Sequence, residues 1–185
     1  MIYNTPFKKR EQSDDQYSKL KNEGVIIFGT GNLGALCLHS LKQKNINPIC
    51  FVDNNFSNWD KKFNGYDVIS PEKLQKDYSE KHIFLSSLNF KYLKRQLNGL
   101  GIKNIHFCDN LFSNFNLDGS NTTWSQDRCK VQLDLYNYAI ISYQDKEKLF
   151  IQSLDLVLTE KCSLKCKDCS NLMQFYAKPV DEDFN

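Results

Sequence analysis

Short apolar segments alternate with amphipathic ones through the first part of the chain. Val25-Ile26-Ile27-Phe28 is too short for a helix and rich in β-branched side chains, as a buried parallel strand would be. Similar strands are predicted at 49–52, 82–87 and 105–108. Helices with an apolar face that could pack against a sheet are predicted at 35–41, 71–78 and 90–100. Strands that alternate with helices in this way predict an α/β domain with a parallel sheet and helices on both faces.

The flanking segments divide the chain into four parts. We expect a polar tail with a short helix at 1–23, the α/β domain at 24–112, a linker with one helix at 113–148, and the start of a second domain at 149–185. The linker contains the turn-forming sequence Leu-Asp-Gly-Ser-Asn-Thr-Thr. A strand predicted at 154–158 opens the second domain.

A glycine-rich turn joins the first predicted strand to the first predicted helix. Gly29, Gly31 and Gly34 form the pattern G-x-G-x-x-G, and Asp53 follows about 20 residues later, at the end of the second strand. In this context Gly29 would form the tight turn, Gly31 would admit a phosphate, and Gly34 would let helix and strand pack closely. Asp53 would bind a ribose hydroxyl. The pattern therefore predicts a nucleotide-binding site.

Two other interpretations of this turn stay open. The glycines could serve only to pack the domain, in which case the ligand site is unused. Asp53-Asn54-Asn55 is also typical of a solvated turn at the end of a strand.

The amino-acid composition narrows the classes of molecule that the protein is expected to bind. With 24 Lys and Arg against 22 Asp and Glu, the formal net charge is +2, which gives no reason to expect nucleic acid or an anionic membrane as a partner. No apolar run reaches the 18 or so residues of a membrane span, and no signal peptide is evident. We therefore expect a cytoplasmic protein that acts on a small molecule.

Three of the seven cysteines lie within eight positions, as Cys162, Cys166 and Cys169, whereas the others are scattered singly. The spacing C-x3-C-x2-C arises by chance about 0.01 times in a chain of this composition. Three thiolates suit a four-iron cluster and would leave one iron open to a small molecule. Zinc needs a fourth ligand, for which Cys129 and His106 are poor candidates. A purely structural helix face with cysteines at i, i+4 and i+7 is the other alternative.

The cysteine segment, directly after the strand predicted at 154–158, resembles the signature of the radical S-adenosylmethionine superfamily. The resemblance implies that Cys162, Cys166 and Cys169 hold a [4Fe–4S] cluster after the first strand of a TIM-like barrel. It also implies S-adenosylmethionine as cofactor, cleaved to a 5′-deoxyadenosyl radical, and an electron donor such as flavodoxin or ferredoxin. Asp168 departs from the family, which usually has an aromatic or apolar residue there.

The chain reaches only Asn185, so the first strand and helix of an incomplete barrel are expected, and we expect this chain to be inactive alone.

The front of the chain resembles the Rossmann-like domains at the start of bacterial sugar-nucleotide-modifying enzymes. The likeness rests on the glycine turn, on Val-Asp-Asn at 52–54, and on Gly-Tyr-Asp-Val-Ile-Ser-Pro-Glu at 65–72. It implies a bound nucleotide or sugar nucleotide. The expected function is thus a radical S-adenosylmethionine enzyme acting on a sugar nucleotide or a cell-surface-glycan precursor.

Two alternative functions stay open. One is a non-catalytic nucleotide-binding or regulatory module with a structural metal at the cysteines. The other is a nicotinamide-dependent oxidoreductase that uses Asp53, but no catalytic pair is recognisable after that residue.

Overall fold

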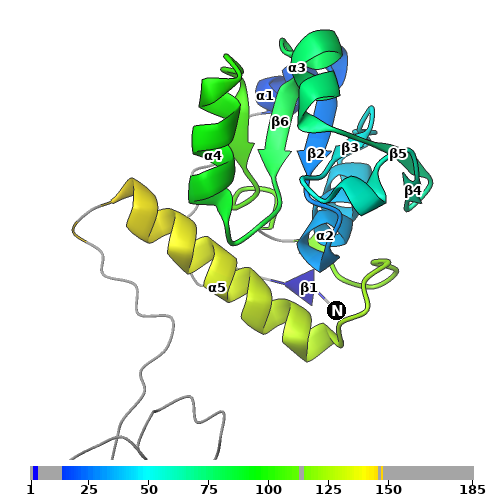
Figure 1. Cartoon of the computed structure of the whole chain (residues 1–185). Helices are drawn as coiled ribbons and strands as arrows, with labels where there is room; N and C mark the ends of the chain where they lie inside the picture. The colour runs from blue at the N-terminus through cyan, green and yellow to red at the C-terminus, as the bar shows by residue number, and fades with distance from the viewer. Residues whose placement is uncertain (1, 4–13, 113–114, 146, 148–185) are drawn as a thin grey trace, which may run out of the picture. The chain divides into compact units, whose positions relative to one another are not determined.

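The computed structural model describes residues 2–3, 14–112, 115–145 and 147 (Figure 1). Contacts divide the chain into two units, Met1–Phe150 and Ile151–Asn185. The predicted start of a barrel at 149–185 lies outside the described residues. Within the described ranges, no helix combines the length and the apolarity that are needed to cross a bilayer.

A six-stranded sheet forms the centre of the first unit, in the order β4-β5-β3-β2-β6-β7. Its parallel strands are β2 (Val25–Phe28), β3 (Phe51–Val52), β5 (Tyr66–Ile69), β6 (His82–Leu85) and β7 (Ile105–Phe107). When these five strands are numbered 1 to 5 in chain order, their order across the sheet is 3-2-1-4-5, which is the Rossmann arrangement. The predicted parallel α/β sheet is confirmed.

A β-hairpin that the apolar pattern did not predict extends the sheet beyond β3. β4 (Lys62–Phe63) runs antiparallel to β5, and the two strands are joined by Asn64 and Gly65. Both joining residues have positive φ, 51° and 86°, as a type I′ turn requires. The Asn-Gly pair was the available signal, because Tyr66–Ile69 is too short and too polar at its start to stand out as an apolar run.

Among the described residues, five helices accompany the sheet; those predicted at 71–78 and 90–100 have nearly the predicted bounds, and the one predicted at 35–41 is longer at both ends. They are α1 (Asp14–Glu23), α2 (Asn32–Gln43), α3 (Pro71–Tyr78), α4 (Phe90–Gly99) and α5 (Gln126–Gln144). A 3₁₀ turn, η1 (Phe56–Asn58), follows β3, and β1 (Ile2–Tyr3) pairs with β8 (Phe115–Asn116). Helix α3 begins as its sequence predicts: Pro71 is its first residue, and the Ser70 hydroxyl accepts a hydrogen bond from the Lys73 N–H at 3.2 Å.

The helices cover both faces because the chain winds in two directions from the centre of the sheet. α2 leads from β2 toward the β4 edge, whereas α3 and α4 lead toward β7. Right-handed crossovers in opposite directions place α2 on one face and α3 and α4 on the other. The core between these layers includes the whole of β2 and β6.

Helix α5 lies across the carboxyl end of the sheet (Figure 1). Its side chains Leu133, Tyr136 and Ile140 are fully buried in the same hydrophobic cluster as the strands. The Tyr136 hydroxyl donates to the Leu85 carbonyl at the end of β6 and accepts from the Cys108 N–H at 3.0 Å. The segment that follows the α/β domain in sequence therefore contributes to the core of that domain.

Candidate functional site

The sheet has a topological switch point between β2 and β6. The chain leaves β2 through α2 in one direction and leaves β6 through α4 in the other. Because these connections lie on opposite faces, they separate beyond the carboxyl ends of the two strands and leave a crevice there. A pocket of about 520 Å³ occupies this place, lined by the turn after β2, the end of β3, residues 86–89, and parts of α4 and α5.

Two glycines of the turn are required by the fold itself. Gly29 has φ of +120°, and a Cβ built on it would lie 2.9 Å from the Ser86 hydroxyl oxygen. A Cβ on Gly34 would lie 2.1 Å from the Gly29 carbonyl oxygen, because α2 starts directly against the turn. Side chains at these positions would therefore disrupt the contact between β2, α2 and β6.

Gly31 differs from the other two. Its φ is −88°, which any residue can adopt, and a Cβ on it would meet no protein atom within 4 Å. Gly31 precedes the first residue of α2, and no side chain caps that helix end. The open space therefore lies where the N–H groups of a helix start can meet an anion.

Asp53 is joined to the glycine turn. Its Oδ2 accepts a hydrogen bond from the Thr30 N–H at 3.1 Å and another from the Thr30 hydroxyl, while Oδ1 accepts from the Asn55 N–H at 2.8 Å. The Asn55 contact is the turn geometry proposed as an alternative. Asp53 also lines the pocket. A carboxylate has about four acceptor positions, so the contacts named here leave room for a further donor on Oδ1.

The two sides of the crevice are held together by polar side chains. The Ser86 hydroxyl donates to the Phe28 carbonyl at 2.9 Å and so joins the ends of β6 and β2. The amides of Asn54 and Gln96 pair reciprocally, both at 2.9 Å, and join the loop after β3 to α4. Among the described residues that line the pocket, Asp53 carries the only charged side chain.

One wall of the pocket comes from a segment predicted to be a linker. Trp124, which precedes α5, and Gln132, within α5, both line the pocket. The Asn32 side chain, at the start of α2, accepts hydrogen bonds from Thr122 and Thr123 and so anchors this segment beside the glycine turn. No local pattern indicated this contact, because its partners are 90 residues apart.

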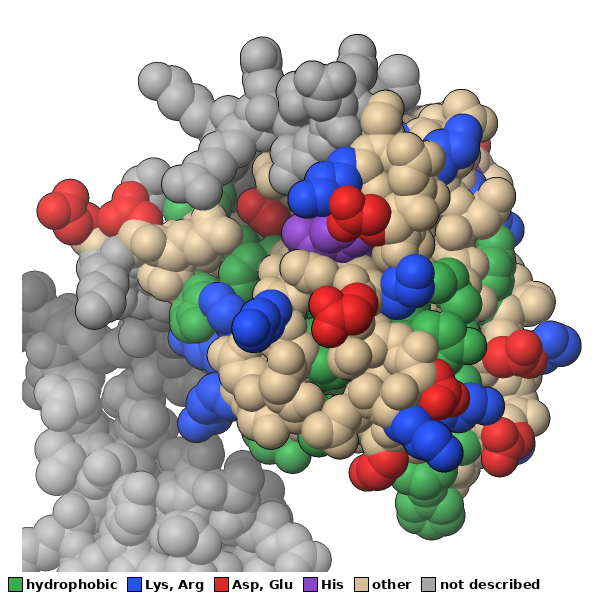
Figure 2. Space-filling view, turned by 90° about the horizontal axis from the view of Figure 1, so that it is seen from above, with side chains coloured by type: hydrophobic (Ala, Val, Ile, Leu, Met, Phe, Trp, Pro, Cys, Tyr) green, Lys and Arg blue, Asp and Glu red, His purple; other side chains and the backbone are tan. Residues whose placement is uncertain are grey.

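A second cluster of ionisable side chains lies at the opposite, amino end of the sheet, where a histidine neighbours acidic and basic side chains (Figure 2). His82 Nε2 lies 2.7 Å from a Glu23 carboxylate oxygen, and His82 Nδ1 lies 2.8 Å from His106 Nε2. Burial, with smaller effects from His82 and Lys19, lowers the pKa of His106 to about 4. This cluster joins α1, β6 and β7 and takes no part in the pocket.

The predicted cluster ligands Cys162, Cys166 and Cys169 lie outside the described residues. Within the part of the chain that is described, no three His, Cys, Asp or Glu side chains are grouped so that they could hold a metal ion. The four scattered cysteines, Cys37, Cys50, Cys108 and Cys129, are buried free thiols.

Comparisons with known proteins gave a match to a family model and a similar solved structure. Residues 21–107 match the model of a family described as C2185-like, N-terminal. A crystal structure of UDP-D-quinovosamine 4-dehydrogenase from Vibrio fischeri is similar at 20% sequence identity, with a TM-score of 0.38. The alignment covers 52% of this chain and 95% of that one. No curated protein matches the chain.

Proposed function

We propose that the first unit binds a nucleotide whose phosphates rest on the turn from Gly29 to Gly34. Gly31 carries this proposal. Close packing explains why positions 29 and 34 are glycine. At position 31 neither a neighbouring protein atom nor the backbone conformation excludes a side chain. A phosphate that approaches the backbone closely does require one.

The surroundings of Gly31 suit an anion. The amino end of α2 supplies N–H groups and the positive end of the helix dipole. Asp53 lies beside the same turn and keeps an acceptor position for a ribose hydroxyl. Because no lysine or arginine of the described residues lines the pocket, backbone N–H groups and the helix dipole would stabilise the phosphate charge.

Calorimetric titration of the whole chain with UDP, ADP, UDP-glucose and NAD⁺ tests this proposal. We expect at least one of these ligands to bind with a dissociation constant in the micromolar range, about −8 kcal/mol at 1 μM. Absence of binding by all four would leave the glycines with a packing role only.

We propose further that the chain is a radical S-adenosylmethionine enzyme, or the N-terminal part of one, whose substrate is a sugar nucleotide or a cell-surface-glycan precursor. The C-x3-C-x2-C spacing of Cys162, Cys166 and Cys169 supports this proposal. Their role would be to ligate three irons of a [4Fe–4S] cluster. Once reduced by a donor such as flavodoxin or ferredoxin, a cluster of this kind supplies the electron that cleaves S-adenosylmethionine. The nucleotide site would then serve to bind the substrate.

The alternative function is a nucleotide-binding module whose cysteines hold a structural metal. Iron, sulfide and zinc analysis of anaerobically prepared protein discriminates between the two. Iron and sulfide in equal amounts favour the enzyme, whereas stoichiometric zinc without sulfide favours the structural site.

A further inference from the structure

We infer that Trp124 contacts the group that the bound nucleotide carries beyond its phosphates, that this group is an uncharged sugar ring, and that Asn32 positions Trp124 for this contact. The inference rests on the proposed nucleotide binding and extends it. Trp124 and Gln132 lie beyond residues 21–107, the segment matched by the family model.

Asn32 holds the segment before α5 through a single oxygen atom. Its Oδ1 accepts hydrogen bonds from the Thr122 hydroxyl at 2.7 Å, the Thr123 N–H at 2.8 Å and the Thr123 hydroxyl at 3.0 Å. Asn32 is also the first residue of α2, next to Gly31. The segment at 122–123 is therefore fixed beside the place proposed for the phosphates.

Trp124 follows this anchor directly and is held on two sides. Its backbone N–H donates to the Thr122 hydroxyl at 3.2 Å, and the Arg128 guanidinium lies 5.7 Å from the centre of its indole ring. Arg128 itself is fixed at the start of α5, where its N–H donates to the Ser125 hydroxyl at 3.3 Å. The half-buried indole thus has a defined position in the pocket wall.

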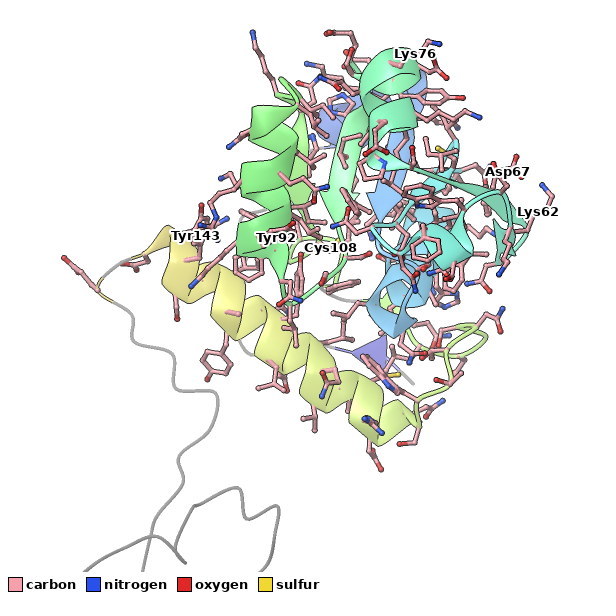
Figure 3. All side chains as sticks on the ribbon, viewed as in Figure 1. Lys62, Asp67, Lys76, Tyr92, Cys108 and Tyr143 are labelled. Carbon is pink, nitrogen blue, oxygen red and sulfur yellow. The ribbon has the colours of Figure 1, made fainter. Side chains whose placement is uncertain are left out.

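The side chains that line the pocket beside Trp124 are uncharged, and Arg128, whose guanidinium lies against the indole, is not among the lining residues. Gln132 from α5 and Tyr92 from α4 line the same pocket, together with Ser87 and Asn89. Figure 3 shows Tyr92 on α4 where this helix approaches α5. Aromatic rings pack against the apolar face of a sugar, and hydroxyl and amide groups pair with its hydroxyls. A carboxylate or a further phosphate would find no cationic side chain among the described lining residues.

The test measures affinity by calorimetry for UDP-glucose, UDP and UDP-glucuronate, and for ADP-glucose and ADP where uridine nucleotides do not bind. We expect the wild-type chain to bind the glucose form about tenfold more tightly than the bare diphosphate, and more tightly than the glucuronate form. Trp124→Ala should remove this tenfold preference and change the affinity for the diphosphate less than twofold. Trp124→Phe should retain most of the preference, because an aromatic ring remains.

The positioning role of Asn32 has a spectroscopic readout. Asn32→Ala should release the indole and shift its fluorescence to longer wavelength, and this shift should be absent in the double variant Asn32→Ala, Trp124→Phe. Val131→Ala is the matched control, because Val131 is exposed on α5 next to Gln132 and does not line the pocket.

The outcomes separate this inference from the proposed function. If the diphosphate binds but the glucose form binds no better, or if Trp124→Ala leaves the preference intact, the inference is wrong and nucleotide binding stands. If NAD⁺ binds with a contact to Trp124 and nucleotide sugars do not, the assignment of a sugar is wrong. If no nucleotide binds the wild-type chain, both proposals are wrong.

Discussion

Thr30 donates two hydrogen bonds to Asp53, one from its backbone N–H at 3.1 Å and one from its hydroxyl. The Thr30 hydroxyl in turn accepts from the Asn58 side chain at 3.0 Å. These contacts bind the loop after β3 to the turn after β2. Asp53, which the glycine pattern predicts to bind a ribose, therefore also fixes the conformation of the turn after β2.

Asp53→Ala should lower both stability and nucleotide affinity. Hydrogen bonds to a charged group contribute about 1.5–3 kcal/mol each, but Asp53 is half-buried and water can replace part of its contacts, so we expect the free energy of unfolding to fall by only roughly 1–3 kcal/mol in total. Urea denaturation measures this change. A double-mutant cycle with Thr30→Val should give a coupling energy of at least about 0.5 kcal/mol, and additive effects would contradict the contact.

Gly31→Val should leave the fold intact and weaken nucleotide binding more than tenfold, or by about 1.4 kcal/mol. A Cβ at this position meets no protein atom within 4 Å, and the valine methyl groups would fill the space proposed for a phosphate. Calorimetry measures the affinity, and thermal denaturation checks the fold. Gly99→Ala is the control, because Gly99 is equally open but lies in α4, away from the pocket. Unchanged affinity in Gly31→Val would exclude a close phosphate contact.

Gly34→Ala should destabilise the domain by about 3 kcal/mol or more, because the new Cβ would overlap the Gly29 carbonyl and α2 would have to move. Urea denaturation would show the loss as a lower midpoint. Wild-type stability of this variant would mean that α2 does not lie against the turn as described.

The stability of the protein should fall as the pH is lowered from about 6.5 to about 4. In this range an unfolded histidine binds a proton, whereas His106 in the folded protein does not, since its pKa is about 4. The unfolded state therefore binds more protons, and the free energy of unfolding decreases by up to about 1.4 kcal/mol per pH unit. His106→Phe should flatten this dependence in a series of urea denaturations, and His39→Gln should retain it. An identical slope in His106→Phe would assign the effect to other groups.

Anaerobically reconstituted protein should bind iron and sulfide and absorb broadly near about 400 nm, as thiolate-ligated clusters do. Replacing Cys162, Cys166 and Cys169 with alanine should abolish the absorption, whereas Cys50→Ala should retain it, because Cys50 is buried next to β3. Iron retained by the triple variant would refute the proposed ligands.

Much of the fold could be predicted because it depends on local physics. β2 was identified from four successive apolar residues, and the start of α3 from Ser70 and Pro71, which act within one helical turn. The hairpin of β4 and β5 does not show as an apolar run, and its local signal is the Asn64-Gly65 pair that forms the turn. The roles of Gly29 and Gly34 also followed from the sequence, since a tight turn and a helix start impose the same geometry wherever they occur.

The sequence by itself determined the type of domain and the place of the turn that would bind phosphate. Only the tertiary structure decided that Asp53 bonds to Thr30, that Asn32 anchors the segment before α5, and that Trp124 forms a wall of the pocket. These contacts join residues 23 to more than 90 positions apart. Hydrophobic periodicity reports which face of one element is buried, but not which distant element covers it, because many partners can bury an apolar face equally well.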